Sequence, residues 1–409
     1  MKESHYFALI DIGILGINIL GGMEMQRRFH RLWLLLLAVF LVCLAAGCGK
    51  ADDSVSEQGV PDVQEHALVA KDDLKIGVLY IADPTVGSGY SYAHDLGISD
   101  MMRNLELRPE QVERAVVPDN DAAGVARTAE KFIADGCQVV IGTSFGYMQT
   151  LAALAEKHPQ VYFAHSSGFL SNGRNFINYF GRIYQARYLS GIVAGLNTKT
   201  GKIGYVAAQG AENAEVTGGI DAFAIGVAAV NPSARVYVRV THSWFDPAAE
   251  QAASEELLAL GCDVMSQHCD TDAPVRLAQQ RGVYAIGYNS DMSKECPKAA
   301  LTSVIWGWGA FYTYYINSLL TGTYDGENYY RGMRDGMVEL TDVADFAADG
   351  TAEQVEAAKK RIMDGSCNVF DGVLETNAGT TVGTADKTLS DAEITGGIHW
   401  YYKNVEVLP

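Results

Sequence analysis

A histidine, a cysteine and two aspartates lie close together between His268 and Asp272, after a short apolar run. Their spacing matches no established metal-binding pattern, and Cys269 is of a type that is commonly buried, so we expect no metal site here. Serine, histidine and aspartate residues occur without a recognisable nucleophile setting, and the chain has no P-loop and no HExxH motif. We therefore predict a protein that is not an enzyme and carries no cofactor.

Gly87-Ser88-Gly89 begins like the dinucleotide-binding motif GxGxxG, but Tyr92 occupies the position of the third glycine. We also expect no helix to open at the start of this segment. Residues 90–92 supply two aromatic rings and a hydroxyl group in place of a phosphate cradle. We interpret the segment as a ligand-binding loop and not as a nucleotide site.

Aromatic residues recur where strands are expected to end, after the ranges 75–82, 138–142, 236–240, 264–267, 283–287 and 302–304. Loops normally carry small polar residues, so this repetition predicts a stacking surface for a flat ligand. In open α/β sheets, ligands bind outside the carboxyl ends of the strands, where these residues fall. The residues that we expect to contact the ligand are Tyr90, Ser91, Tyr92, Phe145, Gly146, Tyr147, Trp244, His268, Asp270, Asp291, Trp306 and Trp308.

Several of these positions also have a structural interpretation. An aromatic residue such as Phe145, taken singly, can cap the end of a sheet from within the core. Asp246 and Asp272 precede helix-start signals and are interpreted as N-caps. Asp270 and Asp291 begin no clear helix, which favours a role as hydrogen-bond acceptors for the ligand.

The elements that position these residues occur twice along the chain. Residues 75–79 (KIGVL) recur as 202–206 (KIGYV), and residues 134–140 recur as 259–265. In both copies a helix ends at glycine and a short apolar strand follows, as in a parallel α/β unit. The pattern predicts two similar halves.

Helices are expected between these strands. Apolar residues at helical spacing predict helices around 122–133 and 220–228, and proline near the first helical position predicts two more, after Asp246 and after Asp272. Strands that alternate with helices form parallel sheets with right-handed crossovers. The fold class is therefore α/β, with two tandem Rossmann-like lobes and a ligand cleft between them.

Composition limits the partners. The formal net charge of −18 leaves no basic stripe for nucleic acid and disfavours an anionic ligand. A body of roughly 335 residues is too large for one hydrophobic core, which supports two lobes. The thiols of the body are odd in number and scattered, so no disulfide framework is expected, although one bridge stays open; they are Cys137, Cys262, Cys269, Cys296 and Cys367.

The N-terminal segment has the features of an export signal. Arginines at 27, 28 and 31 precede an apolar run over 33–46 that is too short to span a membrane, and small residues then lead to Cys48. We expect a signal peptide over 1–47 with the true start at Met25, a lipid on Cys48 and a polar tether over 48–73. An ordinary signal peptide with incidental cysteines is the alternative.

The body from about residue 74 to the end resembles the basic membrane protein family of bacterial lipoproteins, which serve ABC transporters. The resemblance is carried by residues 75–77, the glycine-aromatic first loop, Phe145, residues 287–291 and residues 302–304. It implies a periplasmic-binding-protein type I fold with three hinge crossings. The implied lobes comprise residues 74–185 plus 290–322 and residues 186–289 plus 323–409.

The same resemblance implies a purine base or a purine nucleoside as the ligand. Tyr90 and Phe145 match the two stacking aromatics of the family, and Asp291 matches its ribose-contacting acid. The family's lysine near residue 305 is replaced here. Because the indoles of Trp306 and Trp308 would fill the ribose space, we expect adenine to bind more tightly than adenosine.

We therefore expect a monomeric solute-binding lipoprotein, anchored in the cell envelope and facing the periplasm or the exterior, that delivers a purine to an ABC permease. The alternative is a lipoprotein that reports the same ligand to a membrane sensor without transport. Both functions need the same pocket, so the sequence leaves both open.

Replacing Cys48 with alanine is expected to release the processed protein from membranes, because its thiol is the expected lipid attachment point. Fractionation of cells that express the wild type or Cys48→Ala measures this release. A processed variant that still sediments with membranes would contradict the anchor.

Overall fold

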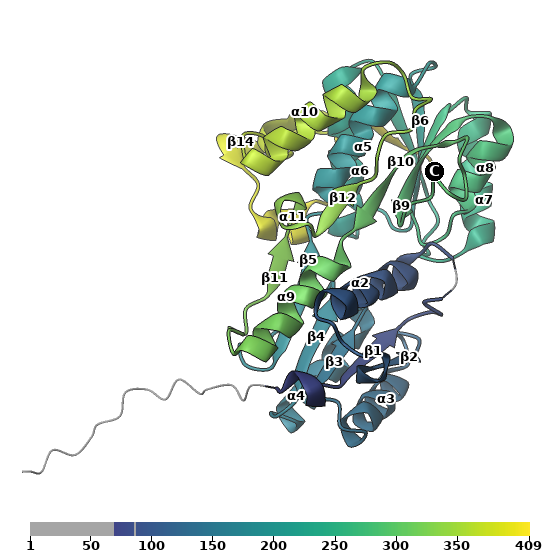
Figure 1. Ribbon diagram of the computed structural model, residues 1–409. Coiled ribbons are helices and arrows are strands. Elements are labelled where there is room, and N and C mark those ends of the chain that lie inside the picture. Colours follow the sequence, from purple (N-terminus) through teal and green to yellow (C-terminus); the bar gives the residue numbers. More distant parts are fainter. Residues whose placement is uncertain (1–68, 86) are drawn as a thin grey trace, which may run out of the picture. The chain divides into compact units, whose positions relative to one another are not determined.

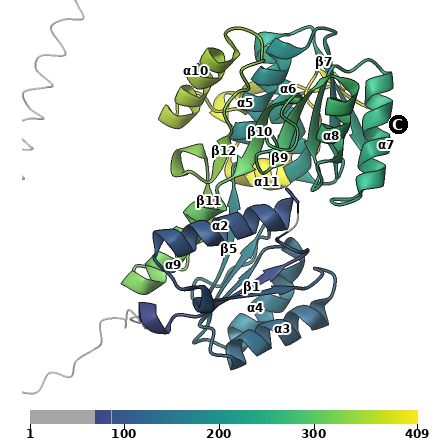
Figure 2. The ribbon, with the colours of Figure 1, turned by 45° about the vertical axis from the view of Figure 1, so that its right-hand side comes forward.

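The computed structural model describes residues 69–409 except residue 86, so the expected signal peptide, Cys48 and most of the tether lie outside the described residues. The described chain forms two α/β lobes, each built on a mainly parallel sheet (Figures 1 and 2). No helix within 69–409 is both long and apolar enough to cross a membrane. The expected fold class is confirmed.

The first sheet has the strand order β11-β5-β4-β3-β1-β2, and all its strands run parallel. Every residue of β1, β3 and β4 is buried, as expected of a parallel sheet that is covered on both faces. The strands are β1 (Ile76–Tyr80), β2 (Val112–Val116), β3 (Val139–Gly142), β4 (Tyr162–Ser166), β5 (Phe176–Gly181) and β11 (Tyr329–Arg331).

Helices cover the two faces of this sheet. α2 (Tyr90–Asn104) packs against α9 (Trp308–Thr321), and α3 (Ala122–Ala134) packs against α4 (Met148–Lys157). Neighbouring residues of β1 show that the pairs lie on opposite faces, because Val78 belongs to the core of α2 and α9 whereas Leu79 belongs to the core of α3 and α4.

The second sheet has the order β12-β10-β9-β8-β6-β7-β15, in which only β12 is antiparallel to its neighbour. It repeats the plan of the first sheet, as the sequence repeat predicts. Its strands are β6 (Lys202–Ala207), β7 (Arg235–Val240), β8 (Val264–His268), β9 (Tyr284–Asn289), β10 (Ala300–Trp306), β12 (Val338–Leu340) and β15 (Val405–Val407).

α5 (Tyr184–Asn197), α6 (Ala214–Val230) and α10 (Thr351–Asp364) gather on one side of the second sheet, and α7 (Pro247–Ala259) and α8 (Ala273–Arg281) pair on the other (Figure 1). Asp246 caps α7 as expected, since its carboxylate accepts hydrogen bonds from the amides of Ala248 and Ala249. Asp272 precedes α8 but makes no cap bond and instead pairs with Arg276 at 2.6 Å.

The C-terminal part adds a hairpin of β13 (Asp371–Glu375) and β14 (Thr381–Thr388), followed by the short helix α11 (Asp391–Gly397). Four 3-10 turns complete the elements: η1 (Lys71–Asp73), η2 (Pro109–Gln111), η3 (Phe145–Tyr147) and η4 (Met333–Asp335). The hairpin forms a sheet of its own and does not extend the sheet of either lobe.

The chain crosses between the lobes three times, as the family resemblance implies: from β5 to α5, from β10 to α9 and from β11 to β12. The crossings bond to one another through the backbone, from Arg182 N to Arg331 O (2.8 Å) and from Gly307 N to Met337 O (2.9 Å). A Cβ atom on Gly307 would lie 1.8 Å from the carbonyl oxygen of Gly336. Only glycine fits at this point of the hinge.

The lobe boundaries differ from the expected ones. β10 lies within 290–322 but pairs with β9 in the second sheet, and β11 lies within 323–409 but pairs with β5 in the first. The expected lobes of β10 and β11 were therefore wrong. Pairing between strands that are far apart in the chain leaves no local pattern in the sequence from which it could be predicted.

Two further expectations are corrected. Residues 90–95 form the start of α2 and not a loop, and the helix begins directly after Gly89. The buried face of α2 includes His94 and Gly97, so the sequence shows no apolar helical pattern there. The five cysteines of the body are all free thiols, so the bridge left open by the sequence does not form.

Gly307→Ala is expected to lower the free energy of unfolding by about 1–3 kcal/mol, because the added methyl group must displace backbone at the hinge. Urea unfolding of the two proteins measures the difference. Gly397→Ala is the matched control, since a Cβ atom there meets nothing within 4 Å. Equal losses in the two variants would contradict the close approach.

Candidate ligand-binding site

A cleft of about 1620 Å³ lies between the lobes, at the carboxyl ends of both sheets. Segments that follow β1, β2, β3 and β4 line one side, and segments that follow β6, β7 and β8 line the other. The crossings and α11 close the remaining wall with Tyr184, Tyr330, Asp391 and Ile394. The cleft is larger than the ~300–1,000 Å³ of a typical small-ligand pocket, so a small ligand would fill only part of it.

Tyr90 is the best-fixed aromatic residue on the first-lobe side. It opens α2, and its hydroxyl group lies 2.8 Å from Ser166 Oγ. Its ring meets those of His94 and Trp308 edge-on, with centroid distances of 4.4 and 5.9 Å. The ring is therefore held in one orientation with part of its surface open to the cleft.

The rim of the cleft carries aromatic side chains that are unusually exposed. Phe145 and Phe169 on the first lobe are 53% and 67% exposed, with centroids 6.3 Å apart, and Phe245 on the second lobe is 65% exposed. The half-buried Trp244 lies beside Phe245. Large apolar side chains gathered at the mouth of a cleft are typical of a binding site.

The second-lobe side rests on a buried arginine. Arg187 is fully buried, its guanidinium lies 4.1 Å from the ring centroid of Tyr288, and its Nη1 donates to Gln267 O at 2.6 Å. Tyr288 in turn lines the cleft. His268 lies behind this wall and packs against Gly219. A Cβ atom on Gly219 would lie only 3.0 Å from the His268 ring.

Glu215, in the first turn of α6, is an acid of the cleft with a strongly raised pKa. Burial raises its pKa to about 7, with a further rise from Asp270 and a partial offset from Arg187. Burial also raises the pKa values of Tyr90, Tyr288 and Tyr330, and the Glu215 carboxylate adds to each rise. Glu215 therefore lies where aromatic side chains of both lobes converge.

Asp270 follows β8 on the same side of the cleft. Burial raises its pKa to about 7, and a hydrogen bond from Asn289 Nδ2 to Asp270 Oδ1 (2.8 Å) acts against the rise. Asn289 has a φ of 69°, and Ser167 at the cleft has a φ of 57°. Left-handed backbone at non-glycine residues is strained and is often found at functional sites.

The structure places six of the twelve expected residues on the lining of this one cleft. They are Tyr90, Ser91, Tyr92, Phe145, Trp244 and Asp270. The hydroxyl group of Ser91 already accepts a hydrogen bond from the amide of Ala82. Direct contact of these residues with a ligand stays a prediction.

The other six do not line the cleft. Tyr147 is fully buried and donates to Val117 O, and Gly146 packs against the backbone of Asp119. His268 is buried behind the wall, and Asp291 is exposed outside the cleft, where it accepts from the amide of Ser293. The remaining two are Trp306 and Trp308.

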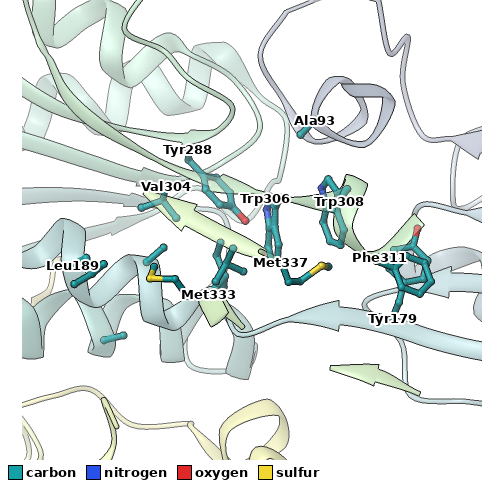
Figure 3. Packing of buried hydrophobic residues seen from close by; sticks show 14 of the residues in the cluster. Ala93, Tyr179, Leu189, Tyr288, Val304, Trp306, Trp308, Phe311, Met333 and Met337 are labelled. Carbon is teal, nitrogen blue, oxygen red and sulfur yellow. The ribbon is translucent and has the colours of Figure 1, made fainter. Parts of the chain in front are cut away.

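Trp306 and Trp308 are core residues of the hinge. Their rings stack with centroids 4.5 Å apart, and Trp308 also stacks on His94 at 4.0 Å. Figure 3 shows the two indoles side by side among buried side chains. Since neither indole reaches the cleft, the expectation that they fill a ribose space loses its basis.

Sequence reasoning missed Glu215, Tyr288, Tyr184 and Tyr330. Glu215 follows β6, which the repeat identifies as the copy of β1, so the rule that ligands bind after strand ends could have found it. Tyr288 directly follows the expected strand 283–287 but was not among the expected ligand contacts; in the structure it lies in β9. Tyr184 and Tyr330 belong to hinge crossings and carry no local signal.

Residues 142–146 have the spacing of a GxSxG nucleophile elbow, although no residue was expected to be catalytic. Ser144 Oγ donates to Asp119 Oδ2 at 2.9 Å and accepts from Gly146 N, and a 3-10 turn follows at once. No histidine forms a hydrogen bond with this serine within 69–409. The described residues also contain no cluster of metal-ligating side chains.

Comparison with known proteins adds to this geometry. The family model of PnrA-like ABC transporter substrate-binding proteins matches residues 74–371. A purine-binding protein of Brucella abortus is 31% identical over 341 residues, which cover 83% of this chain and 95% of that protein. A putative ABC transporter glucose-binding protein of Haloferax volcanii is 34% identical over 284 residues, which cover 69% of this chain and 71% of that protein.

An ABC transporter solute-binding protein from Conexibacter woesei has a similar solved structure. The match has a TM-score of 0.59 at 19% identity and covers 72% of this chain and 98% of that chain. At this identity the likeness shows the fold alone, which is that of periplasmic binding proteins of type I.

Glu215→Gln is expected to gain stability relative to the wild type as the pH rises. The folded protein holds a proton on Glu215 up to about pH 7, whereas the ordinary pKa is 4.5. Between these values the folded state binds more protons than the unfolded state, so the contribution of Glu215 to stability falls with rising pH. Urea unfolding at pH 5 and pH 8 should show a relative gain of about 1–3 kcal/mol. The exposed Glu353→Gln is the control, and a gain that is independent of pH would contradict the burial of this charge.

Proposed function

Because this chain belongs to the family of PnrA-like ABC transporter substrate-binding proteins, which bind solutes outside the cytoplasm and are not enzymes, we propose that its cleft binds a purine base or purine nucleoside. The bound ligand is then passed to an ABC permease in the membrane. The protein acts as a monomer that is held at the membrane by a lipid on Cys48.

One observation carries the choice of ligand: aromatic side chains of both lobes line one cleft around two carboxyl groups. Tyr90 and Phe145 come from the first lobe, and Trp244 and Tyr288 come from the second. A purine offers two flat faces for such rings and N–H groups at its edge for the acids. Stacking of a base on an aromatic side chain contributes about 1–3 kcal/mol.

The two relatives differ in ligand, since one is named for purine and the other for glucose. A glucose ring presents hydroxyl groups around its whole edge, and each one that is buried needs a partner. Exposed phenylalanines at 145, 169 and 245 supply none. The purine-binding relative also matches along nearly its whole length, which favours a purine here.

Closure of the lobes supports capture of a small ligand in a large cleft. Three crossings allow a hinge motion, and one bridge already spans the cleft edge, from Ser290 Oγ to Ser88 O at 2.8 Å. A Cβ atom on Gly89 would lie 2.3 Å from Asp270 O, so the start of α2 and the end of β8 are in contact. Closing the cleft brings the aromatic rims together over the ligand.

Calorimetric titration of the purified body with adenine, hypoxanthine, adenosine and glucose tests the function. At least one purine is expected to bind, and more tightly than glucose. Tyr90→Ala and Phe145→Ala should each weaken that binding at least fivefold, or about 1 kcal/mol, because each removes a stacking face. Phe346→Ala is the control, since Phe346 is exposed and stacks on Tyr284 away from the cleft. Glucose binding more tightly than every purine would refute the proposal.

A further inference from the structure

Glu215 forms no ion pair with an ionised side chain within residues 69–409. Its one ion-pair contact within 69–409 is with His268 Nε2, at 3.7 Å from Oε1. Burial holds the pKa of His268 well below its ordinary value, and Arg187 lowers it further, so this imidazole is neutral. The Glu215 side chain is 26% exposed and accepts no hydrogen bond from residues 69–409, so its carboxyl group is available for a donor from a ligand.

The position of Glu215 on α6 does not require an acid. Asn213 already caps this helix, since its side-chain oxygen accepts from the amide of Val216 at 3.1 Å. Arg187 is bonded to Gln267 O and stacked on Tyr288, and it forms no ion pair with Glu215 in the described part of the chain. Neither helix capping nor an ion pair explains the residue.

Asp270 supplies a second acceptor in the same cleft. Asn289 Nδ2 donates to Oδ1, and Oδ2 receives no hydrogen bond from residues 69–409. Asp270 does not begin a helix either, because α8 starts after Asp272. The backbone N–H of Asp270 donates to Trp244 O at 2.8 Å, which holds Asp270 next to the aromatic side of the cleft.

We propose that Glu215 and Asp270 together accept N–H donors from one flat ligand, and that this pair selects an aminopurine as the free base. The inference rests on the proposed function and names the ligand class of that site. Free adenine has one donor edge at its amino group and another at its imidazole N–H. A nucleoside has carbon in place of that imidazole hydrogen, so one acid would be left without a donor.

The hydrogen bond from Asn289 makes Asp270→Asn a test of the acceptor role of Asp270. In Asp270→Asn the new carboxamide oxygen would accept from Asn289 Nδ2, which turns its NH₂ group toward the ligand. The NH₂ group of the new asparagine and the N–H group of the ligand would then face each other, and neither can accept a hydrogen bond. Glu215→Gln similarly replaces a charge-assisted bond by a neutral one and adds a donor to the site.

The experiment measures the affinities of adenine, purine and 9-methyladenine by calorimetry. Purine lacks the amino group, and 9-methyladenine lacks the imidazole N–H. The wild type is expected to bind adenine at least tenfold more tightly than either analogue. Glu215→Gln and Asp270→Asn should each weaken adenine binding at least tenfold and should each reduce one of the two preferences to less than threefold.

Glu353→Gln is the matched control, because Glu353 also lies in the first turn of a helix but is exposed on α10, away from the cleft. It should keep all three affinities within twofold of the wild type. If the wild type binds adenine but both cleft variants keep its affinity and its preferences, the inference is wrong and the proposed function stands. If the wild type binds no purine, the proposed function fails and this inference fails with it.

Discussion

Two of the three hinge crossings are in direct backbone contact, and the position of the cleft follows from this contact. Gly307 approaches the carbonyl oxygen of Gly336 more closely than any side chain would allow, and Gly307 N bonds to Met337 O at 2.9 Å. This contact sets where one sheet ends relative to the other. Because parallel sheets present their loops at one edge, it brings the carboxyl ends of both sheets to the same cleft. The site therefore exists only as a consequence of the hinge.

An aromatic stack connects that hinge to the cleft. His94, Trp308 and Trp306 stack in sequence, and Phe180 lies against Trp306 with its centroid 5.0 Å away. Phe180 lines the cleft, whereas the two indoles are sealed in the core. Tyr90 lies edge-on against His94, at the other end of the stack. The rings that face the cleft, Tyr90 and Phe180, are thus held in fixed orientations by rings that are buried in the core.

The cleft is also the place where the fold accepts an electrostatic cost. Glu215 and Asp270 are largely removed from water in a protein with a net charge of −18, and their pKa values of about 7 show that the charged forms are disfavoured. Well-packed cores avoid unpaired acids, so residues that break this rule belong to sites where binding matters more than stability. A donor from the ligand would remove this cost on binding.

The α/β class, the two lobes, most strand positions and six residues of the cleft follow from the sequence, because periodicity, helix signals and the internal repeat are visible in it. The sequence also predicted that residues that follow strands, such as Phe145 and Asp270, would line the cleft. It did not determine that β10 belongs to the second sheet and β11 to the first, since pairing joins segments that are far apart in the chain. Nor did it separate Tyr90, which faces the cleft, from Trp308, which faces the core: both begin helices after glycine, and only packing against neighbouring elements decides which ring is covered.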